Sequence, residues 1–431
     1  MKKDSRYIAF KLLEQYFESN LYINDLISDY FDKNNLEIAT KKFTNNLVLG
    51  VVRMRGKYDH ILSSIYHGDY KKIKNKIRYI LYIGVHQIEE MDSVPNHAAI
   101  YTTVNIAKSL FPGLDKLVNA LLRKFISEID KYKFNKNDQK TYPLLSHPLW
   151  LLNKWVQNYG LSKTVGICNF NNSSQNIWFR INKQTDKTVE MLTQEGFDVE
   201  FNEIHNLFFK TNNPHALIKS KFFNDGFLSI QNPINGFIVD LLEPKNSDRI
   251  IDGCSAPGGK GTLISLKASK SNIISIDNNI HRTKKTREAI RRHNIKNMKI
   301  LIKDLSRDVL PISNKILLDV PCTGTGVINR RVDIKWRRTE KELKDISLLQ
   351  YDILSNAAKY LDTGGVIVYS TCSIEPEENE FLIKRFMDTH NFIVEDASNF
   401  VNNNIVQDRA IKVLPGEYSL DGGFAIRLKK I

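Results

Sequence analysis

Residues 250–262, IIDGCSAPGGKGT, contain the transition that decides the fold of this chain. An apolar run ends at Asp252, a glycine-rich turn follows, and a helix is predicted to start at Gly259. Gly258 and Gly259 lack side chains, so the backbone can approach a ligand closely, and the start of the helix offers unpaired N–H groups. The stretch therefore predicts a strand, a ligand-binding turn and a helix in succession.

The same alternation of short apolar strands and helices continues to the end of the chain. Strands are predicted in DRIIDG (248–253), NIISID (272–277), KILIKD (299–304), KILLDV (315–320), GVIVYS (365–370), FIVED (392–396) and GGFAIRLKK (422–430). Helices are predicted between them, including residues 281–292, 340–361 and 376–389. This pattern is typical of a Rossmann-like α/β domain with a doubly wound, mostly parallel sheet, here over residues 241–431.

The first half of the chain has other patterns. Apolar residues recur at spacings of three and four through residues 1–145, which predicts an all-helical domain. Residues 146–240 combine strand-like segments such as IWFRIN (177–182) with a helical segment, TDKTVEMLTQEG (185–196), and predict a small α+β module. A length of 431 residues suits such a multi-domain chain.

The composition favours a polyanionic partner. The formal net charge is +14, which indicates nucleic acid, although a solvated lysine-rich surface is the alternative. No apolar run is long enough to span a membrane, and charges interrupt the start of the chain where a signal peptide would need an apolar core. We expect a cytoplasmic protein without membrane contact. The candidate nucleic-acid contacts are residues 71–78 (KKIKNKIR), residues 281–292 (HRTKKTREAIRR), Arg330, Arg331, Arg337 and Arg338.

The cysteines point to thiol chemistry and away from metal binding. The chain contains four, Cys168, Cys254, Cys322 and Cys372, and none has CxxC or Cys/His ligand spacing, so we expect neither zinc nor another metal. In a reducing cytosol they are expected to be free thiols. Cys168 is predicted to be a small buried apolar side chain, whereas Cys322 and Cys372 directly follow predicted strands.

Several polar residues are predicted to meet in one cleft. In open α/β sheets, ligands bind beyond the carboxyl ends of the strands. Asp277 ends the strand after the glycine-rich turn, where a carboxylate can accept hydrogen bonds from ribose hydroxyls. Asp304, Asp319 and the two cysteines also follow strands. The chain lacks GxGxxG and GxxxxGK[ST], so an adenosine-bearing ligand other than a nicotinamide cofactor or a nucleoside triphosphate is predicted.

Three sequence blocks resemble those of the RNA cytosine-C5 methyltransferases, specifically the bacterial RsmB (Fmu/Sun) group. The blocks are DGCSAPGGK (252–260), DVPCTGTGVINRRVDIKW (319–336) and STCSIEPEENE (370–380). The likeness extends through HAAIYTTVNIAKS (97–109), GLDKLVNALLRKF (113–125) and SHPLWLLNKW (146–155) into a segment similar to the RNA-binding protein NusB. The resemblance implies that the all-helical domain of residues 1–145 is NusB-like and binds RNA.

The resemblance also implies an activity and the residues that perform it. The protein is expected to be an S-adenosylmethionine-dependent 16S rRNA (cytosine-C5)-methyltransferase that acts, as a monomer, on unassembled or partly assembled small-subunit ribosomal RNA. By the same resemblance Cys372 is the nucleophile, Cys322 assists release, and Asp319 is the acid of the D-x-P-C block. The residues expected at the cofactor are Cys254, Ser255, Ala256, Pro257, Gly258, Gly259, Lys260, Asp277 at the ribose, Asp304 near the adenine, and Asp319.

The chemistry makes demands on the cysteine that attacks. Cytosine C5 is a poor nucleophile, and a thiolate that adds to C6 makes it enamine-like. An ordinary thiol has a pKa of about 8.5, so its site has to stabilise the thiolate. We expect the helix begun by residues 375–380 (EPEENE) to place its N-terminus next to Cys372 for this purpose. We also expect Asp319, protonated or hydrogen-bonded, to hold the N3 edge of cytosine.

Three alternatives stay open. In DNA cytosine methyltransferases the Pro-Cys cysteine attacks, which would make Cys322 the nucleophile. The substrate could be a transfer RNA, or the protein could be a non-catalytic, NusB-like RNA-binding or antitermination factor. An amino-methyltransferase is disfavoured because the block at residues 319–322 lacks the aromatic of (D/N)-P-P-(Y/F). Asn232, Val332 and Gly423 depart from residues that are frequent in the family, outside the catalytic and cofactor positions of the three blocks.

Overall fold

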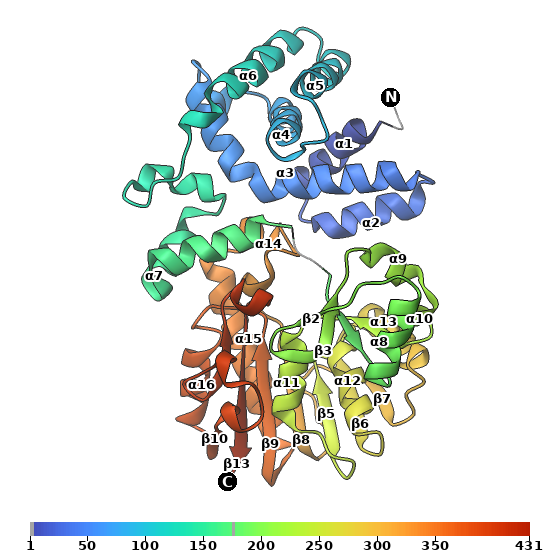
Figure 1. Ribbon diagram of the computed structural model, residues 1–431. Coiled ribbons are helices and arrows are strands. Elements are labelled where there is room, and N and C mark those ends of the chain that lie inside the picture. Colours follow the sequence, from blue (N-terminus) through green and yellow to red (C-terminus); the bar gives the residue numbers. More distant parts are fainter. Residues whose placement is uncertain (1–3, 175–176) are drawn as a thin grey trace. The chain divides into compact units, whose positions relative to one another are not determined.

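The computed structural model describes residues 4–174 and 177–431 (Figure 1). The chain forms two compact units. The helical unit contains residues 1–173 and 328–337, and the sheet unit contains residues 174–327 and 338–431. Residues 328–337 therefore belong to the helical unit by their contacts, although in sequence they interrupt the sheet unit.

Amphipathic helices form the helical unit around one apolar core. They are α1 (Ser5–Glu18), α2 (Ile23–Lys33), α3 (Ile38–Ile65), α4 (Asn75–Glu90), α5 (Asn96–Leu110), α6 (Asp115–Glu128), α7 (Leu149–Asn172) and α14 (Ile334–Arg337), with 3-10 turns at η1 (Tyr70–Lys72), η2 (Ile129–Lys131) and η3 (Gln139–Leu145). Residues 79–87 of α4 are all buried. A helix that is buried on every side lies inside the core, and α4 packs against α1, α3, α5 and α6.

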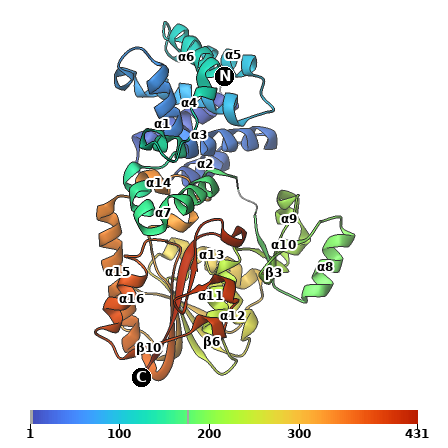
Figure 2. The same ribbon diagram turned by 60° about the vertical axis from the view of Figure 1, so that its left-hand side comes forward.

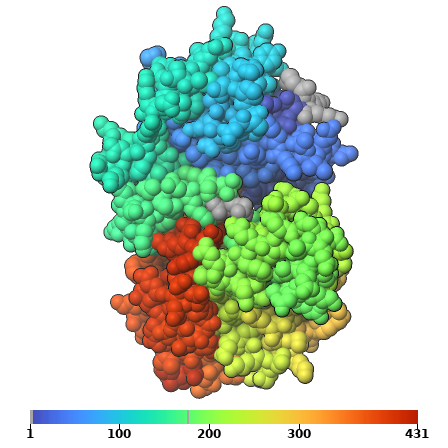
Figure 3. All heavy atoms as spheres, viewed as in Figure 1, coloured from blue at the N-terminus to red at the C-terminus, as the bar shows by residue number. Residues whose placement is uncertain are grey.

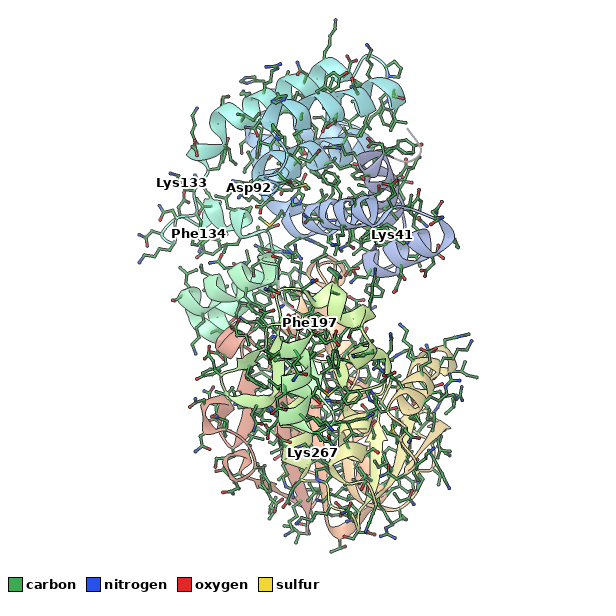
Figure 4. All side chains as sticks on the ribbon, turned by 45° about the vertical axis from the view of Figure 1, so that its right-hand side comes forward. Lys41, Asp92, Lys133, Phe134, Phe197 and Lys267 are labelled. Carbon is green, nitrogen blue, oxygen red and sulfur yellow. The ribbon has the colours of Figure 1, made fainter. Side chains whose placement is uncertain are left out.

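The sheet unit begins with a small α+β module, as predicted. Its antiparallel sheet has the order β2–β3–β1–β4. The elements are β1 (Phe179–Ile181), α8 (Thr185–Gln194), β2 (Glu200–Asn202), β3 (His205–Lys210), α9 (Pro214–Lys219), α10 (Lys221–Asn224) and β4 (Leu228–Ile230). Aromatic rings hold α10 on this sheet: Phe222 is buried in one cluster with Phe179 and Phe209 of the strands. Partly buried Phe197, labelled in Figure 4, packs against Phe222 at 6.5 Å between ring centroids.

The large sheet is mixed, with a parallel core. Its order is β11–β12–β13–β9–β8–β5–β6–β7, and β10 pairs with β13. The strands are β5 (Arg249–Gly253), β6 (Asn272–Asp277), β7 (Met298–Ile302), β8 (Ser313–Asp319), β9 (Leu361–Thr371), β10 (Phe392–Glu395), β11 (Val406–Gln407), β12 (Ala410–Val413) and β13 (Gly423–Lys430). Strands β5 to β9 pair in parallel, and β10 to β13 add antiparallel pairs. The predicted fold class is confirmed.

Helices cover both faces of this sheet (Figure 2). One face carries α15 (Glu340–Lys359) and α16 (Glu380–Met387), and the other carries α11 (Ile234–Leu242), α12 (Gly259–Lys267) and α13 (Ile280–Arg292). Each face has its own apolar cluster. Because both faces are buried, the parallel strands are continuous apolar runs, which is why the sequence revealed them.

The order of the parallel strands creates a switch point between β5 and β8. From β5 the chain proceeds outward to β6 and β7, and it then returns to place β8 and β9 on the other side of β5. The loops that follow β5 and β8 diverge at this point, and ligands bind there in open α/β sheets. In the part of the chain that the structure covers, no helix combines the length and apolar character needed to cross a membrane.

Candidate active site

Three loops at the carboxyl ends of neighbouring parallel strands form the candidate site. Residues 254–260 follow β5, residues 320–326 follow β8, and Cys372 follows β9. Each of these loops lies within one of the three sequence blocks. The convergence predicted from strand ends is therefore present in the sheet order, and the detailed contacts below determine its chemistry.

The loop after β5 is a close-packed cradle. Cys254 has a φ of 56° and Gly258 a φ of 97°, both in the left-handed region. A Cβ at Gly258 would lie 2.9 Å from Cγ2 of Thr286, so only glycine fits there without displacing α13. Burial raises the pKa of Cys254, and the carboxylates of Asp319 and Asp277 raise it further. Cys254 is therefore a protonated lining residue of the cradle, not a nucleophile.

Asp277 links this cradle to the next strand. It is 2% exposed, its Oδ2 accepts the N–H of Ala256 at 3.1 Å, and its Oδ1 accepts the N–H of Asn279 at 2.9 Å. Arg282 lies 3.6 Å from Oδ2 and donates to the carbonyl of Ala256 at 2.8 Å. Each carboxylate oxygen retains a lone pair. These contacts fix the carboxylate and still allow it to accept a hydrogen bond from a ribose hydroxyl.

Asp304, which follows β7, is held by local donors. Its Oδ1 accepts the hydroxyl of Ser306 at 2.7 Å and the N–H of the same residue at 3.0 Å, and Arg307 lies 3.0 Å from Oδ2. The hydrogen bonds from Ser306 lower the pKa of Asp304. A carboxylate after β7, another after β6 and the cradle after β5 form a polar series that fits the adenosine part of a ligand.

Lys260 and Asp319 form an ion pair across the switch point. Lys260 Nζ, in the first turn of α12, lies 2.7 Å from Oδ2 of Asp319 at the end of β8. Oδ1 of Asp319 accepts the hydroxyl of Ser370 at 3.2 Å. The side chain of Asp319 is 36% exposed, whereas that of Lys260 is 11% exposed. The pair thus presents a donor and an acceptor next to each other at the surface of the site.

The two strand-end cysteines are in contact. Sγ of Cys322 lies 3.1 Å from Sγ of Cys372, and Cys372 is exposed. The contact with Cys372 raises the pKa of Cys322 well above its ordinary value, and burial adds to this. Cys322 is therefore a thiol that can donate to the sulfur of Cys372. An exposed sulfur that accepts an S–H donor is prepared to act as a nucleophile.

Glu378 joins the two cysteine loops, a role that the sequence analysis did not find. Its buried carboxylate accepts the N–H of Thr323 and the amide of Gln350, each at 2.8–2.9 Å, and the hydroxyls of Thr323 and Ser373. Burial raises the pKa of Glu378, and the hydrogen bonds from Ser373, Thr323 and Gln350 oppose this rise. The signal in the sequence is a glutamate six residues after the cysteine, but the acidic pattern of residues 375–380 predicts a helix start there instead.

The expected helix next to Cys372 is wrong in position. Residues 375–379 form turns, and α16 begins only at Glu380, eight residues after Cys372. The reason is that Glu378 points inward to the two loops, while its N–H bonds to the carbonyl of Glu375 in a tight turn. A helix dipole therefore does not act directly on Cys372, and the thiol of Cys322 is its close donor.

Arg180 of the small module is a second residue that the sequence did not reveal. It is completely buried and donates to the carbonyl of Gly259 at 3.0 Å and to the hydroxyl of Thr262 at 3.4 Å, both at the start of α12. Gln231 accepts from it as well. Burial lowers the pKa of Arg180 to about 9. The small module thereby holds the helix that follows the cradle, and the two adjoin in Figure 3.

The remaining predicted positions lie elsewhere. Arg337, expected beside the cleft, donates to backbone carbonyls of α1 and its following loop in the helical unit, because these carbonyls lack helical partners.

Burial raises the pKa of Cys168 to about 12, as suits an apolar side chain. Asn232 accepts the N–H of Ile234 at 3.1 Å at the start of α11, and Val332 lies in the core of the helical unit. Lys267, labelled in Figure 4, pairs with Asp240 at 2.6 Å.

Family models match most of the chain. The NusB family matches residues 3–127, the ferredoxin-like domain of RsmF/B-like methyltransferases matches residues 147–208, and 16S rRNA methyltransferase RsmB/F matches residues 239–429. These matches occur in the same order as the helical region, the small module and the large sheet.

Curated relatives and solved structures cover nearly the whole chain. "Probable ribosomal RNA small subunit methyltransferase B" of Synechocystis is 29% identical over 99% of both chains. "Ribosomal RNA small subunit methyltransferase B" of Proteus mirabilis is 29% identical over 99% of this chain and 98% of that one. The crystal structure of PH0851 has a TM-score of 0.76 at 23% identity, covering 98% of this chain and 97% of that one, and shows a common fold. NSun6 from Pyrococcus horikoshii has a TM-score of 0.59 at 23% identity, covering 66% of this chain and 98% of that one.

Proposed function

We propose that this protein methylates C5 of a cytosine in small-subunit ribosomal RNA, because residues 239–429 match the family model of 16S rRNA methyltransferase RsmB/F, the family that the sequence blocks resemble. The relatives that carry the name ribosomal RNA small subunit methyltransferase B span 98–99% of their own length in the comparison, which supports this substrate. The observation that carries the mechanism is the contact between Cys322 and Cys372.

Sulfur chemistry makes cytosine C5 nucleophilic. The thiolate of Cys372 adds to C6, and the new C–S bond moves electron density to C5. After C5 has taken the methyl group, the thiol of Cys322 gives its proton to the departing sulfur of Cys372, and the sulfur of Cys322 then accepts the C5 proton. The electrons of that C–H bond restore the C5–C6 double bond as the C6–S bond breaks. Covalent catalysis of this kind divides one difficult step into easier ones. Cys372 is recovered unchanged.

The different exposure of the two cysteines suggests different roles, because Cys372 is exposed and Cys322 is only partly so. A protonated Cys322 can donate its S–H to the sulfur of Cys372, which lies 3.1 Å away. Cys372 is also the exposed member of the pair, and a base that has left its stack can reach it. We therefore assign attack to Cys372 and release to Cys322, and the alternative in which the Pro-Cys cysteine attacks is an outcome of the experiment below.

The Lys260–Asp319 pair suits the polar edge of cytosine. N3 of cytosine accepts a hydrogen bond and its amino group donates one, so an ammonium and a carboxylate 2.7 Å apart match this edge. Donation by Lys260 to N3 withdraws electrons from the ring and favours addition at C6. In this arrangement Lys260 donates to N3, the contact expected for Asp319 from the sequence, and Asp319 accepts from the amino group of the same edge.

The cradle of residues 254–260, with Asp277 and Asp304, is the proposed site of S-adenosylmethionine. That cofactor supplies an electrophilic methyl group on a sulfonium centre when it is bound. Gly258 allows close backbone approach, Asp277 accepts from ribose hydroxyls, and Asp304 lies further along the strand ends, on the side of the adenine.

The exposed face of α13 is the proposed contact for the RNA backbone. Lys284, Lys285, Arg287 and Arg291 are exposed, and within the described chain none of the four has an ion-pair partner. Replacing Lys284 and Arg287 by glutamine should weaken RNA binding about uniformly among sequences and reduce its salt dependence. A salt dependence identical to that of the wild type would exclude this face.

A trapping experiment tests the mechanism. RNA with 5-fluorocytidine lacks the C5 proton, so the wild type should form a covalent complex that survives denaturing electrophoresis. Cys372→Ser should form none, because a serine hydroxyl is a far weaker nucleophile. Cys322→Ser should form the complex and should also retain ordinary RNA covalently, because release is slow.

The other outcomes separate the alternatives. A complex with Cys372→Ser, and none with Cys322→Ser, would make Cys322 the nucleophile. If the wild type forms no complex and binds no S-adenosylmethionine, the protein is an RNA-binding factor without this activity. Bisulfite sequencing of ribosomal and transfer RNA from a deletion strain distinguishes the two RNA classes, since only the true substrate loses a 5-methylcytosine.

A further inference from the structure

The second half of one catalytic block folds into the helical unit. Residues 328–337 (INRRVDIKWR), here called the docking segment, follow the cysteine loop directly, yet their contacts lie in the helical unit. Val332 is 1% exposed and belongs to the apolar core of that unit, and Trp336 packs against the same core. The docking segment is therefore an internal part of the helical unit and not a surface loop.

Arg337 completes the end of α1. Its guanidinium donates to the carbonyls of Tyr16 at 2.9 Å, Ser19 at 2.8 Å and Leu21 at 2.9 Å. It also lies 4.5 Å above the ring of Tyr16. The last carbonyls of a helix lack helical partners and carry partial negative charge, so a cation that bonds several of them is well placed. Lysine could not reproduce this fork of donors.

Asp333 and Trp336 fix the segment at two further points. The carboxylate of Asp333 is 1% exposed and accepts the N–H of Ile23, the first residue of α2, at 2.9 Å. The indole N–H of Trp336 donates to the carbonyl of Val52 at 2.7 Å, and Arg55 lies 4.4 Å above its ring. Asp333 bonds to the start of α2, and Arg337 bonds to the end of α1. These two contacts of opposite charge give the segment one orientation.

Both ends of the docking segment lead directly to the cysteine loops. Before it, the N–H of Gly326 donates to the carbonyl of Cys372 at 3.0 Å, and the carbonyl of Gly326 accepts from Gly422 at 2.8 Å. After it, Arg338 donates to the carbonyl of Thr323 at 2.9 Å. A displacement of the segment would therefore be transmitted through the backbone to the loop that carries Cys322.

We propose that Asp333, Trp336 and Arg337 are positioning residues for catalysis. They fix the docking segment in the helical unit, and the ends of the segment fix residues 322–326 against Cys372. The helical unit thereby sets the rate at which the covalent adduct is released, in addition to any contribution that it makes to RNA affinity. This inference rests on the function proposed above.

Replacing one arginine while keeping its neighbour tests the proposal in the full-length protein. Arg337→Ala should lower kcat about tenfold, because small displacements of reacting groups are costly, and should leave ordinary RNA covalently bound for longer. KM for RNA and the dissociation constant of S-adenosylmethionine should change less than about twofold. Arg331→Ala is the matched control: Arg331 is exposed in the same segment, and its loss should not prolong the adduct.

Two insertions address the covalent connection itself. Gly-Gly inserted between Val327 and Ile328 should relax the connection and prolong the adduct, as in Arg337→Ala. The same insertion after Ser173, at another of the boundaries between the units, should leave adduct lifetime unchanged. These variants keep every side chain, so they test the proposal even if Arg337→Ala does not fold.

The results separate this inference from the proposed function. If Arg337→Ala raises KM for RNA without changing kcat, Arg337 is an RNA contact and the proposal is wrong. Equal effects of the two insertions would also overturn it, since they would reflect general loosening of the chain. Failure of the wild type to form any adduct would instead refute the proposed function.

Discussion

The cysteine loop, residues 320–326, and the docking segment, residues 328–337, are neighbours in sequence but are held by different partners. The loop is held by polar groups of the sheet unit: Glu378 accepts from Thr323, and Gly326 bonds to the backbone of Cys372. The docking segment is held by the helical unit, where Asp333 and Arg337 bond to the backbone at helix ends. One contiguous motif therefore contains two parts with different tasks, chemistry in the first and attachment in the second.

The difference also lies in how each part uses charge. At the loop, a buried carboxylate receives hydrogen bonds from several neutral donors, which fixes two loops around an exposed sulfur. In the docking segment, Asp333 and Arg337 bond to the backbone at opposite kinds of helix end. The loop is thus built around a reactive atom, and the segment is built for one fixed orientation. Substitutions can therefore be directed at one part or at the other, and their effects on the site compared.

The largest expected effect comes from Gly326→Ala in the loop. A Cβ there would lie 2.2 Å from the carbonyl oxygen of Gly422 and 2.8 Å from that of Cys372. Both are backbone atoms, so the loop has to move away from the nucleophile. We expect kcat to fall about 100-fold, the loss typical of a displacement of about 1 Å, with the melting of the helical unit unchanged.

Gly166→Ala is the control for this substitution. Gly166 lies within α7, and a Cβ there would meet nothing within 4 Å. Activity should stay at the wild-type level, and the helix should gain up to about 1 kcal/mol in stability. If Gly326→Ala also retains wild-type activity, the loop tolerates displacement and the contrast between the two parts is lost.

The second prediction makes the matching change on the side of the docking segment. A Cβ at Gly56 in α3 would lie 2.7 Å from Cη2 of Trp336, so the indole has to shift by a few tenths of an ångström. We expect a fall in kcat of about fivefold, smaller than for Gly326→Ala, because the displacement reaches the cysteines only through the segment. Steady-state kinetics measures it. An unchanged kcat, together with an intact fold by circular dichroism, would show that the segment does not act on the site.

Regular features of the sequence predicted most of the sheet unit. The parallel strands are apolar runs buried on both faces, and the catalytic groups follow their carboxyl ends, so Asp277, Asp319 and the two cysteines could be assigned to one edge. The site residues themselves stay proposals. What the chain order could predict was the edge of the sheet, since this follows from strand direction alone.

Features that depend on the direction of a single side chain could not be predicted. Glu378 was assigned to a helix start, because acidic residues there are common, but its inward direction shortened α16. Arg180 lies in a strand of the small module, and nothing in the local sequence indicates that it contacts the start of α12, about 80 residues later in the chain. The division of the block at residue 327 depends on contacts with helices about 300 residues earlier in the chain, which no local pattern contains.

The third prediction uses pH to distinguish the two parts. Burial raises the pKa of Glu378, so its contribution to stability is present below the usual value of 4.5 and is lost as pH rises through the folded-state pKa. Burial lowers the pKa of Lys335 in the docking segment well below 10.5, so its contribution is present above 10.5 and is lost as pH falls through the folded-state pKa. Each group changes the free energy of unfolding by at most about 1.4 kcal/mol per pH unit.

Denaturant unfolding over a series of pH values measures these opposite slopes. Glu378→Gln should remove the loss of stability just above pH 4.5, and Lys335→Met should remove the gain that approaches completion near pH 10.5. Glu378→Gln should leave the pH dependence assigned to Lys335 unchanged, and Lys335→Met should leave the pH dependence assigned to Glu378 unchanged. If each variant instead changed the pH dependence of the free energy of unfolding in both pH ranges, the two groups would titrate as one coupled system in a single cooperative body. That result would contradict the separation argued above.

The smallest expected effect is that of Trp336→Phe, and it is the sharpest test of how the docking segment works. Phenylalanine keeps an aromatic ring beneath Arg55 but loses the donor to the carbonyl of Val52, a bond of 2.7 Å. One such hydrogen bond contributes about 1 kcal/mol to stability, so the helical unit should melt a few degrees lower. Because the three contacts of Arg337 remain, the segment should keep its orientation, and kcat should fall no more than about twofold. A loss as large as that of Arg337→Ala would mean that the indole alone holds the segment, and the fork of Arg337 would then contribute only to the stability of α1.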